Sequence, residues 1–526
     1  MAGTAASTVI AAVGIIVIAR LLGPADYGLY TLAFVLPSLF AAIIDFGLSP
    51  ALTRYGASLR AQQKYGKLAS MIGSAVLLKL VAGAGAFLLV LGFSGQLATS
   101  VLQRQDMGQL LVLACISILF QGFYTLSYNA FVGLDRMEQG ALVMVLRDTT
   151  RMTLSSVLVV VGFGTAGAIL GQVAGLIIAG LLGVSLLLTH RQVFRKMPSE
   201  MELNEGRRAD IEAMIGYGLP LYVGSLLTIT LMQYHRIILA FFVSDAEIGN
   251  FSAAFNFGAL VAIVATPVAT ALFPAFSKLD LETRKDDVKR MFKLSVRYVT
   301  LLIFPVAIAI ATLSKDLTRA VYGASYADAS TYLTLYMLTW LFLWGGAGLG
   351  NLLITNFFAG IGRSREALKV ALVQLVVFLP AAPVMASLYR VPGSIVAVIL
   401  SALVSTVFGL RLAVRKYEMQ VDVVGLLRAL AASLVSALPI LPIVYYSPLP
   451  SLANALIGAL IYLAAYLTVA PVFRAVKRAD LQTLIPILGQ IRILRPATRL
   501  IFAYETRVLN LVERETKSTA PSGNPT

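Results

Sequence analysis

Four basic side chains lie deep inside long apolar stretches of this sequence, where a charge is costly. Lys79, Arg151 and Arg236 each stand well inside a run of hydrophobic residues, and Arg147 shares a helical face with Arg151, with extension to the inner interface as its alternative. Ionisable groups inside a hydrocarbon layer are rare and usually face a cavity. Ammonium and guanidinium groups bind phosphate oxygens strongly. The four residues therefore predict a site for an anionic group such as a phosphate.

Two acidic residues and a histidine accompany these cations. An internal ion pair is the alternative to a binding role for Lys79, Arg151 and Arg236; for Arg151 the partner would be Asp148, which stands three positions earlier. Asp45 has no basic residue one helical turn away and is our candidate for carrying an exchangeable ion or proton. His235 can change its charge near neutral pH, although a hydrogen-bonded packing role is the alternative.

The composition requires lipid as the solvent for most of the chain. Of 526 residues, 58% are hydrophobic and 13% are charged, whereas soluble domains are about 25% charged. Because about 20 apolar residues cross a bilayer, we predict an all-α polytopic membrane protein with about 14 transmembrane helices. The expected spans are 4–22, 28–49, 68–93, 109–132, 141–162, 165–189, 214–243, 249–274, 291–313, 329–359, 368–389, 393–413, 423–446 and 452–473.

The net charge of +16 is explained by membrane topology. With a cytoplasmic N-terminus, most loop arginines and lysines fall on the inside, as the positive-inside rule requires. Both termini are then cytoplasmic, the location is the cytoplasmic membrane, and nucleic acid is not an expected partner. The basic loops and tail are expected to contact an anionic lipid surface instead. The only basic residues in the expected outside loops are Arg20, Arg104, Lys315, Arg319 and Arg390.

No catalytic residues, metal site or cofactor are expected. The single cysteine, Cys115, cannot form an intramolecular disulfide, and two histidines cannot build a zinc site without other ligands. No nucleotide-binding motif is present.

An internal repeat organises the chain. Residues 23–30 match 244–251 at a shift of 221, and two further matches follow at shifts of 224 (50–54 with 274–278) and 227 (129–136 with 356–363). An even number of spans per copy makes the copies parallel, and we predict two parallel six-helix lobes around a central cavity, plus two extra helices. The expected domains are an N-terminal lobe at 1–189, a cytoplasmic linker at 190–212, a C-terminal lobe at 213–415, helices 13 and 14 at 416–474, and a cationic amphipathic tail with a disordered end at 475–526.

The first repeated motif is interpreted as an outer hairpin joining the first two helices of each lobe. Gly23 and Gly28 would permit a tight reversal, and Pro24 cannot continue a helix. We expect Asp26 and Glu247 to be structural carboxylates at the water interface.

The stretch ARLLGPADYGLYTLAF, the sequence FPAFSKL and a Gly-x-x-Arg turn at 133–136 and 360–363 resemble the Wzx-type polysaccharide flippases of the multidrug/oligosaccharidyl-lipid/polysaccharide exporter superfamily. The resemblance implies a V-shaped two-lobe transporter that moves polyprenyl-(pyro)phosphate-linked oligosaccharides from the inner to the outer leaflet. We expect the protein to be a monomer. Many family members carry an aspartate before the basic residue of the seventh span, where this chain has His235 before Arg236.

Three other functions are alternatives to a polysaccharide flippase. A multidrug exporter of the same superfamily would use carboxylates for cationic drugs, which the excess of cations opposes. A membrane glycosyltransferase or polymerase needs a large outer domain with catalytic carboxylates, and the expected outer loops are short. A non-transporting scaffold would leave the charges inside the spans unexplained.

Overall fold

The computed structural model describes residues 2–196, 206–277, 284–343 and 352–476, together with 480, 504, 506–508 and 510. In these ranges the chain is helical almost throughout and contains no strand, which confirms the all-α prediction. Most of the long helices are apolar enough to cross a membrane. The chain divides into two compact units, which are described separately below.

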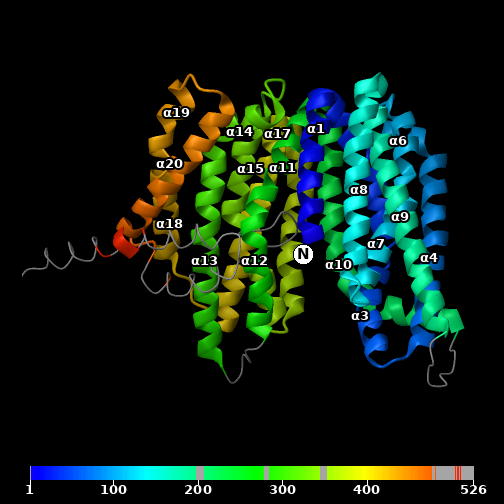
Figure 1. The fold of residues 1–526 in the computed structure, drawn as a ribbon. Coiled ribbons are helices and arrows are strands. Elements are labelled where there is room, and N and C mark those ends of the chain that lie inside the picture. Colours follow the sequence, from blue (N-terminus) through cyan, green and yellow to red (C-terminus); the bar gives the residue numbers. More distant parts are fainter. Residues whose placement is uncertain are drawn as a thin grey trace, which may run out of the picture. The chain divides into compact units, whose positions relative to one another are not determined.

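The first unit contains residues 1–252 and 386–394. Its long helices run side by side, as the blue to green ribbons in Figure 1 show. The helices are α1 (Ala2–Ala33), α2 (Val35–Ile43), α3 (Leu48–Ala61), α4 (Tyr65–Gly92), α5 (Ser94–Ser100), α6 (Met107–Cys115), α7 (Ser117–Gly133), α8 (Met137–Leu158), η1 (Val159–Phe163), α9 (Gly164–Lys196), α10 (Gly206–Phe242) and the first two turns of α11 (Asp245–Asn256).

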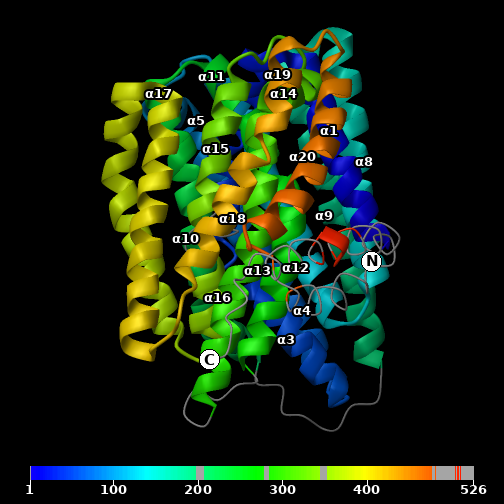
Figure 2. The ribbon, with the colours of Figure 1, turned by 90° about the vertical axis from the view of Figure 1, so that its left-hand side faces the viewer.

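The second unit contains residues 253–385 and 395–526. Figure 2 shows α17 as two adjacent arms, because the helical geometry is interrupted at Tyr389 and Arg390, within the stretch 386–394 that belongs to the first unit. Besides the end of α11, the helices are α12 (Gly258–Ser277), α13 (Lys285–Thr312), α14 (Ser314–Tyr322), α15 (Ala329–Leu343), α16 (Leu352–Gly360), α17 (Ser364–Tyr417), α18 (Val423–Val435), η2 (Leu438–Ile440), α19 (Leu441–Tyr446) and α20 (Ser451–Val472).

The described residues contain ten candidate membrane-spanning segments, fewer than the 14 spans expected. Three of these segments contain an internal break and each covers two expected spans: Ala6–Ile43, Met137–Val193 and Ser364–Tyr417. The expected span 329–359 includes residues 344–351, which lie outside the described ranges. The count of 14 therefore stays a prediction.

The domain boundaries also stay predictions. The first compact unit continues to residue 252 rather than ending with the expected lobe at 189, because α10 packs against α3 and α4. Part of the expected linker, at 197–205, and most of the expected tail lie outside the described residues.

Apolar side chains form the core of each unit. In the first unit, Leu52, Ile72, Phe131 and other residues of α3, α4, α7, α8 and α9 form one buried cluster. In the second unit, α13, α18 and α20 pack around Leu301 and Tyr462. Burial of such side chains removes about 1.5–3 kcal/mol each of unfavourable hydration when the alternative is water, whereas in lipid close packing supplies the attraction instead.

Basic residues at the start of α13 are tied to the end of α17 in the second unit. The ammonium groups of Lys285 and Lys289 lie 2.7 and 3.0 Å from the carboxylate of Glu418, and their hydrogen bonds hold the pKa of Glu418 below its ordinary value. Arg297 binds Asp480 at 2.6 Å and Asp422 at 3.5 Å. Its side chain is 10% exposed and is held by these two carboxylates.

The backbone confirms the sequence repeat at a turn in each unit. Asp135 and Gly362, 227 positions apart, both have a positive φ, 55° and 75°. The residues that follow, Arg136 and Arg363, have nearly the same dihedral angles, φ −110° and ψ 51° against φ −102° and ψ 50°. Each donates its backbone N–H at 2.8 Å to the carbonyl five residues earlier. Equivalent sequences therefore fold into equivalent turns.

The repeated hairpin motifs meet at a reciprocal contact inside the first unit. A Cβ atom on Gly28 would lie 1.9 Å from the carbonyl oxygen of Asp245, and a Cβ on Gly249 would lie 1.8 Å from that of Pro24. Both pairs of equivalent residues are related by the shift of 221. The turns thus lie at the same place, as parallel copies require; full superposition of two six-helix lobes stays a prediction.

The role expected for Gly28 was wrong. The chain remains helical from Ala2 to Ala33 except at Gly23, whose φ of 75° and ψ of 173° interrupt the helix. Gly23 alone supplies the backbone freedom expected of both glycines. Gly28 lies within the helix, and its lack of a side chain lets the backbone at Asp245 approach closely.

Replacing Gly28 or Gly249 by alanine is expected to lower the melting temperature of the purified protein. The added methyl group would overlap backbone atoms, and overpacking typically costs about 1–3 kcal/mol. Gly85→Ala is the control, because Gly85 is exposed on α4 and nothing lies within 4 Å of its added Cβ. Equal melting temperatures for all three variants, measured in detergent by tryptophan fluorescence, would contradict the close contact.

Candidate functional site

A buried carboxylate holds two of the expected cations together on α8. Asp148 is fully buried, and Arg147 approaches it with its Nε at 3.0 Å and its Nη2 at 2.9 and 3.1 Å. Arg151 lies farther away, with its Nη2 3.9 Å from Asp148. The ion pair weighed as the alternative for Arg151 is therefore present, but Arg147 is the stronger partner. We call Ser7, Tyr124, Arg147, Asp148 and Arg151 the Asp148 group.

Neighbouring helices fix the position of the Asp148 group. The backbone of α9 runs close to α8 at Gly175, where a Cβ would lie 2.7 Å from the carbonyl oxygen of Arg147. On α1, Ser7 donates its hydroxyl to Asp148. The guanidinium of Arg147 lies over the ring of Tyr124 on α7, 4.5 Å from its centroid, as a cation–π contact requires. Ser7 and Tyr124 were not expected from sequence, because neither is charged.

Arg151 retains an unused donor. Its Nη2 donates to the carbonyl oxygen of Ala11 at 3.1 Å, while its buried Nε–H has no partner among the described residues. Its side chain is 12% exposed. With two guanidinium groups and one carboxylate, the Asp148 group carries a net positive charge, which an added anion would neutralise.

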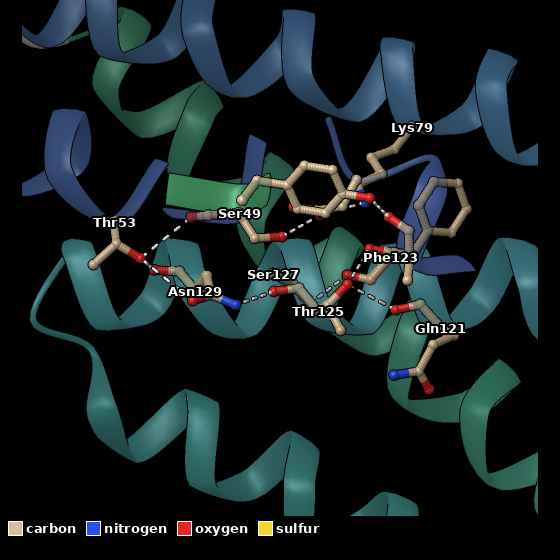
Figure 3. Close-up of polar contacts among 12 residues, drawn as sticks. Ser49, Thr53, Lys79, Gln121, Phe123, Thr125, Ser127 and Asn129 are labelled. Atoms are coloured by element: carbon tan, nitrogen blue, oxygen red, sulfur yellow. Dashed lines mark hydrogen bonds and ion pairs between the residues drawn. The ribbon is translucent and has the colours of Figure 1, made fainter. Parts of the chain in front are cut away.

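Two other residues singled out from the sequence, Lys79 and Asp45, form an ion pair. Lys79, on α4, lies with its Nζ 2.6 Å from Asp45, and the Ser49 hydroxyl donates to the same carboxylate oxygen at 2.6 Å. Figure 3 shows Lys79 and Ser49 directed toward one another. Asp45 thus has a cation from another helix, although none lies one turn away on its own. Helical periodicity in the sequence did not indicate this pair, and an anion-binding role for Lys79 and an ion-coupling role for Asp45 stay predictions.

Asp45 lies where the chain is not helical. The break separates α2 from α3, and Phe46 and Gly47 both have a positive φ there, 47° and 79°. The Tyr222 hydroxyl on α10 donates to the carbonyl oxygen of Ala42 at the end of α2. These contacts fix the loop that presents Asp45 to Lys79.

Most of the hydroxyl and amide groups along α7 bond to their own helix. Thr53 reaches across from α3 to the carbonyl oxygen of Asn129 at 2.9 Å, Asn129 donates to that of Thr125 and Thr125 to that of Gln121 (Figure 3). Ser127 likewise donates to the carbonyl of Phe123. This polar row stabilises α3 against α7, and its donors are engaged.

Arg236 and His235 lie on α10, apart from these two groups in the contacts that they make. Arg236 is half-buried, and the phenol of Tyr27 on α1 interacts with it electrostatically. No carboxylate pairs with it in the part of the chain that the structure describes. His235 packs edge-on against Phe251, with ring centroids 5.2 Å apart, in agreement with the packing alternative. A binding role for Arg236 and a coupling role for His235 stay predictions.

Two arginines that sequence reasoning counted only as outside-loop residues hold the turn between α10 and α11. Arg104 places its Nε 2.8 Å from Asp245 and donates to the carbonyl oxygens of Ala240 and Val243 at 3.0 and 2.7 Å. These carbonyls end α10, where a cation is favourable. Arg390 forms an ion pair with Glu247. Their structural role could have been suspected from the sequence, because both arginines lie in expected outside loops, against the positive-inside bias.

Glu247 has the structural role expected of it. Ser244 and Glu247 form a capping box at the start of α11: the backbone N–H and hydroxyl of Ser244 donate to the carboxylate at 3.0 and 2.7 Å. Arg390, its partner, has φ 55° and ψ −136°, close to the φ 52° and ψ −136° of Gly164 at the equivalent position 226 residues earlier. A non-glycine residue costs about 1–3 kcal/mol in such a conformation, which the ion pair helps to offset.

The described residues contain no group of three His, Cys, Asp or Glu side chains that could hold a metal ion. Cations inside apolar helices, broken helices and an internal repeat together define a polytopic membrane transporter. Residues 1–280, more than half of the chain, match the family described as polysaccharide biosynthesis protein, and the chain belongs to that family. The probable low-salt glycan biosynthesis flippase Agl15 of Haloferax volcanii is 21% identical over 401 residues, which cover 75% of this chain and 78% of the relative.

Solved structures confirm the fold. The inward closed conformation of the lipid II flippase MurJ matches with a TM-score of 0.69 and 14% identity, covering 88% of this chain and 96% of MurJ. An inward-facing multidrug resistance transporter of the MATE family, in the MOP superfamily, matches with a TM-score of 0.62 and 15% identity, covering 78% and 94%. The resemblance inferred from the hairpin motif is therefore confirmed at the level of family and fold, and the chain is a multi-pass membrane transporter, not an enzyme.

Proposed function

We propose that this protein is a flippase that moves a polyprenyl-(pyro)phosphate-linked oligosaccharide from the inner to the outer leaflet of the cytoplasmic membrane, for cell-surface polysaccharide biosynthesis. The observation that carries the proposal is the excess positive charge inside apolar helices. The Asp148 group has two cations and one anion, and Arg236 has no carboxylate partner among the described residues. Family membership and the name of the relative Agl15 support it.

The Asp148 group can replace the hydrogen bonds that a diphosphate loses when it leaves water. Burying an anion without hydrogen bonds is strongly unfavourable, and guanidinium N–H groups replace those bonds. Asp148 orients Arg147 on one side and leaves the Nε–H of Arg151 without a partner. We assign Arg147, Arg151 and Arg236 to substrate binding and Lys79 to a different role, argued below.

Two repeated lobes that rock about the membrane plane would alternate access to this site. In this proposal the protein works as a monomer, both termini are cytoplasmic, and the basic loops and tail lie on anionic lipid. The Gly28–Gly249 contact would then close one side of the transporter.

A multidrug exporter of the same superfamily is the alternative, because the fold is shared with MATE transporters. Cationic drugs require accessible carboxylates in the spans. The two candidates, Asp45 and Asp148, are both neutralised by ion pairs at 3.0 Å or less. The sign of the remaining charge therefore favours the anionic lipid-linked substrate.

Reconstituted protein is expected to flip a lipid-linked oligosaccharide faster than protein-free liposomes do. The measurement is the time course with which an added glycosidase, confined to one side, cleaves the labelled sugar. Extrusion of a cationic dye without any flipping of the lipid-linked sugar would support the exporter and contradict our proposal.

Flipping is further expected to accelerate under an inside-negative membrane potential. A diphosphate lipid carries about two negative charges, and each is worth roughly 2.3 kcal/mol per 100 mV if it crosses uncompensated. A potassium–valinomycin potential, with pH and sodium equal on both sides, isolates this effect. No response to the potential, together with a response to an ion gradient that Asp45→Asn abolishes, would instead establish ion antiport.

A further inference from the structure

The end of α2 forms a place that attracts cations. Asp45 follows the last turn of α2, and the C-terminal end of a helix carries a partial negative charge. Broken helices with such ends commonly coordinate cations in membrane transporters. The Ser49 hydroxyl donates a hydrogen bond to the Asp45 carboxylate at 2.6 Å.

Lys79 already fills this place. Its side chain is fully buried, and its Nζ lies 2.6 Å from Asp45, whose side chain is 14% exposed. The stem of Lys79 passes Gly122 on α7, where a Cβ atom would lie 3.6 Å from Cδ. The lysine therefore reaches Asp45 along a packed path from a different helix, and both charges lie where water screens them little.

We propose that the Lys79 ammonium is a tethered counter-cation, which occupies the place beside Asp45 that an exchangeable ion would otherwise take. Transport by this chain then needs neither sodium nor a proton at Asp45. The charge pair costs free energy to bury, and removal of one partner leaves the other uncompensated. Loss of Lys79 should therefore turn Asp45 into a site that requires a cation from solution.

The test depends on which other groups near Asp45 can carry a charge. Lys79 on α4 and Tyr222 on α10 are the titratable groups that interact with it, and Ser49 on α3 is the neutral one. Tyr222 donates its hydroxyl to the carbonyl oxygen of Ala42. A variant that changes Lys79 alone therefore leaves a carboxylate with only neutral hydrogen-bonding neighbours.

Thermal unfolding of detergent-solubilised variants tests the proposal without any transport assay. Lys79→Met is expected to melt roughly 5 °C or more below the charge-neutral Lys79→Met/Asp45→Asn double variant. Sodium chloride in place of choline chloride, or mild acidification, should recover most of this difference, because a sodium ion or a proton then neutralises Asp45. The double variant and the wild type should show no such recovery. Equal melting of the single and double variants under all conditions would overturn the proposal.

Transport provides a second readout if Lys79→Met cannot be purified. At a fixed membrane potential, wild-type flipping is expected at the same rate in sodium, potassium or choline, and the double variant should retain flipping within about threefold. A wild type that requires a sodium or proton gradient, or a folded but inactive double variant, would overturn the tethered cation. This arm alone rests on the proposed function: if the wild type flips no lipid-linked sugar, the proposed function fails, while the thermal result still decides the role of Lys79.

Discussion

Replacing Arg151 by alanine is expected to lower the rate of flipping at least about 30-fold while the protein still inserts and folds. Arg147 continues to neutralise Asp148 at 2.9–3.1 Å, so no carboxylate is left unpaired. The variant instead removes a charged partner of the anionic substrate. Loss of such a partner in a buried site costs about 2–5 kcal/mol, and 1.36 kcal/mol is a tenfold change in rate. The measurement is initial flipping of a lipid-linked oligosaccharide in proteoliposomes.

Two further variants sharpen this result. Arg236→Ala should be equally damaging, since Arg236 is the second cation assigned to the substrate and pairs with no carboxylate in the described ranges. Arg428→Ala is the control: Arg428 lies in the second turn of α18 and is half-buried, so it can extend to the interface. Wild-type rates for Arg151→Ala and Arg236→Ala would remove the charged site from the proposal.

A disulfide between Thr31 and Ser252 is expected to reduce flipping to the background rate, and reduction should restore it. The two hydroxyl oxygens lie 3.3 Å apart, and the residues are equivalent in the repeat, at the shift of 221. If the repeats separate at this point in every transport cycle, a covalent bond there stops the cycle. The experiment uses Thr31→Cys/Ser252→Cys in a Cys115→Ala background, with flipping measured after oxidation and again after reduction.

The matched control is a disulfide within a single copy of the repeat, whereas Thr31 and Ser252 belong to different copies. The hydroxyls of Ser314 and Thr334 lie 2.8 Å apart on α14 and α15, and both residues belong to the second unit. Oxidised Ser314→Cys/Thr334→Cys should flip at nearly the rate of its reduced form. Unimpaired flipping by a fully cross-linked Thr31–Ser252 variant, established by a gel shift, would show that this contact does not open during transport.

The spans and the repeat were predictable because their signals are local. An apolar run of sufficient length is helical in lipid whatever surrounds it, and most expected spans fall within observed apolar helices. The repeat is likewise visible as short matched segments, and the backbone at Asp135 and Gly362 follows the same alignment. The kink at Gly23 was recognisable from the Gly-Pro pair, whereas the packing role of Gly28 was not, because its neighbour Asp245 is distant in the chain.

The sequence by itself determined the membrane environment, the all-helical class, the repeat and which charges lie inside apolar helices. Only the tertiary structure decided which of those charges are neutralised. Inside the expected spans, Lys79 meets Asp45 34 positions away. At the ends of the helices, Arg104 likewise meets Asp245 141 positions away and Arg390 meets Glu247 143 positions away. The physical reason is that a charge in a span is satisfied by groups on neighbouring helices, and helical periodicity specifies neighbours only one turn away on the same helix.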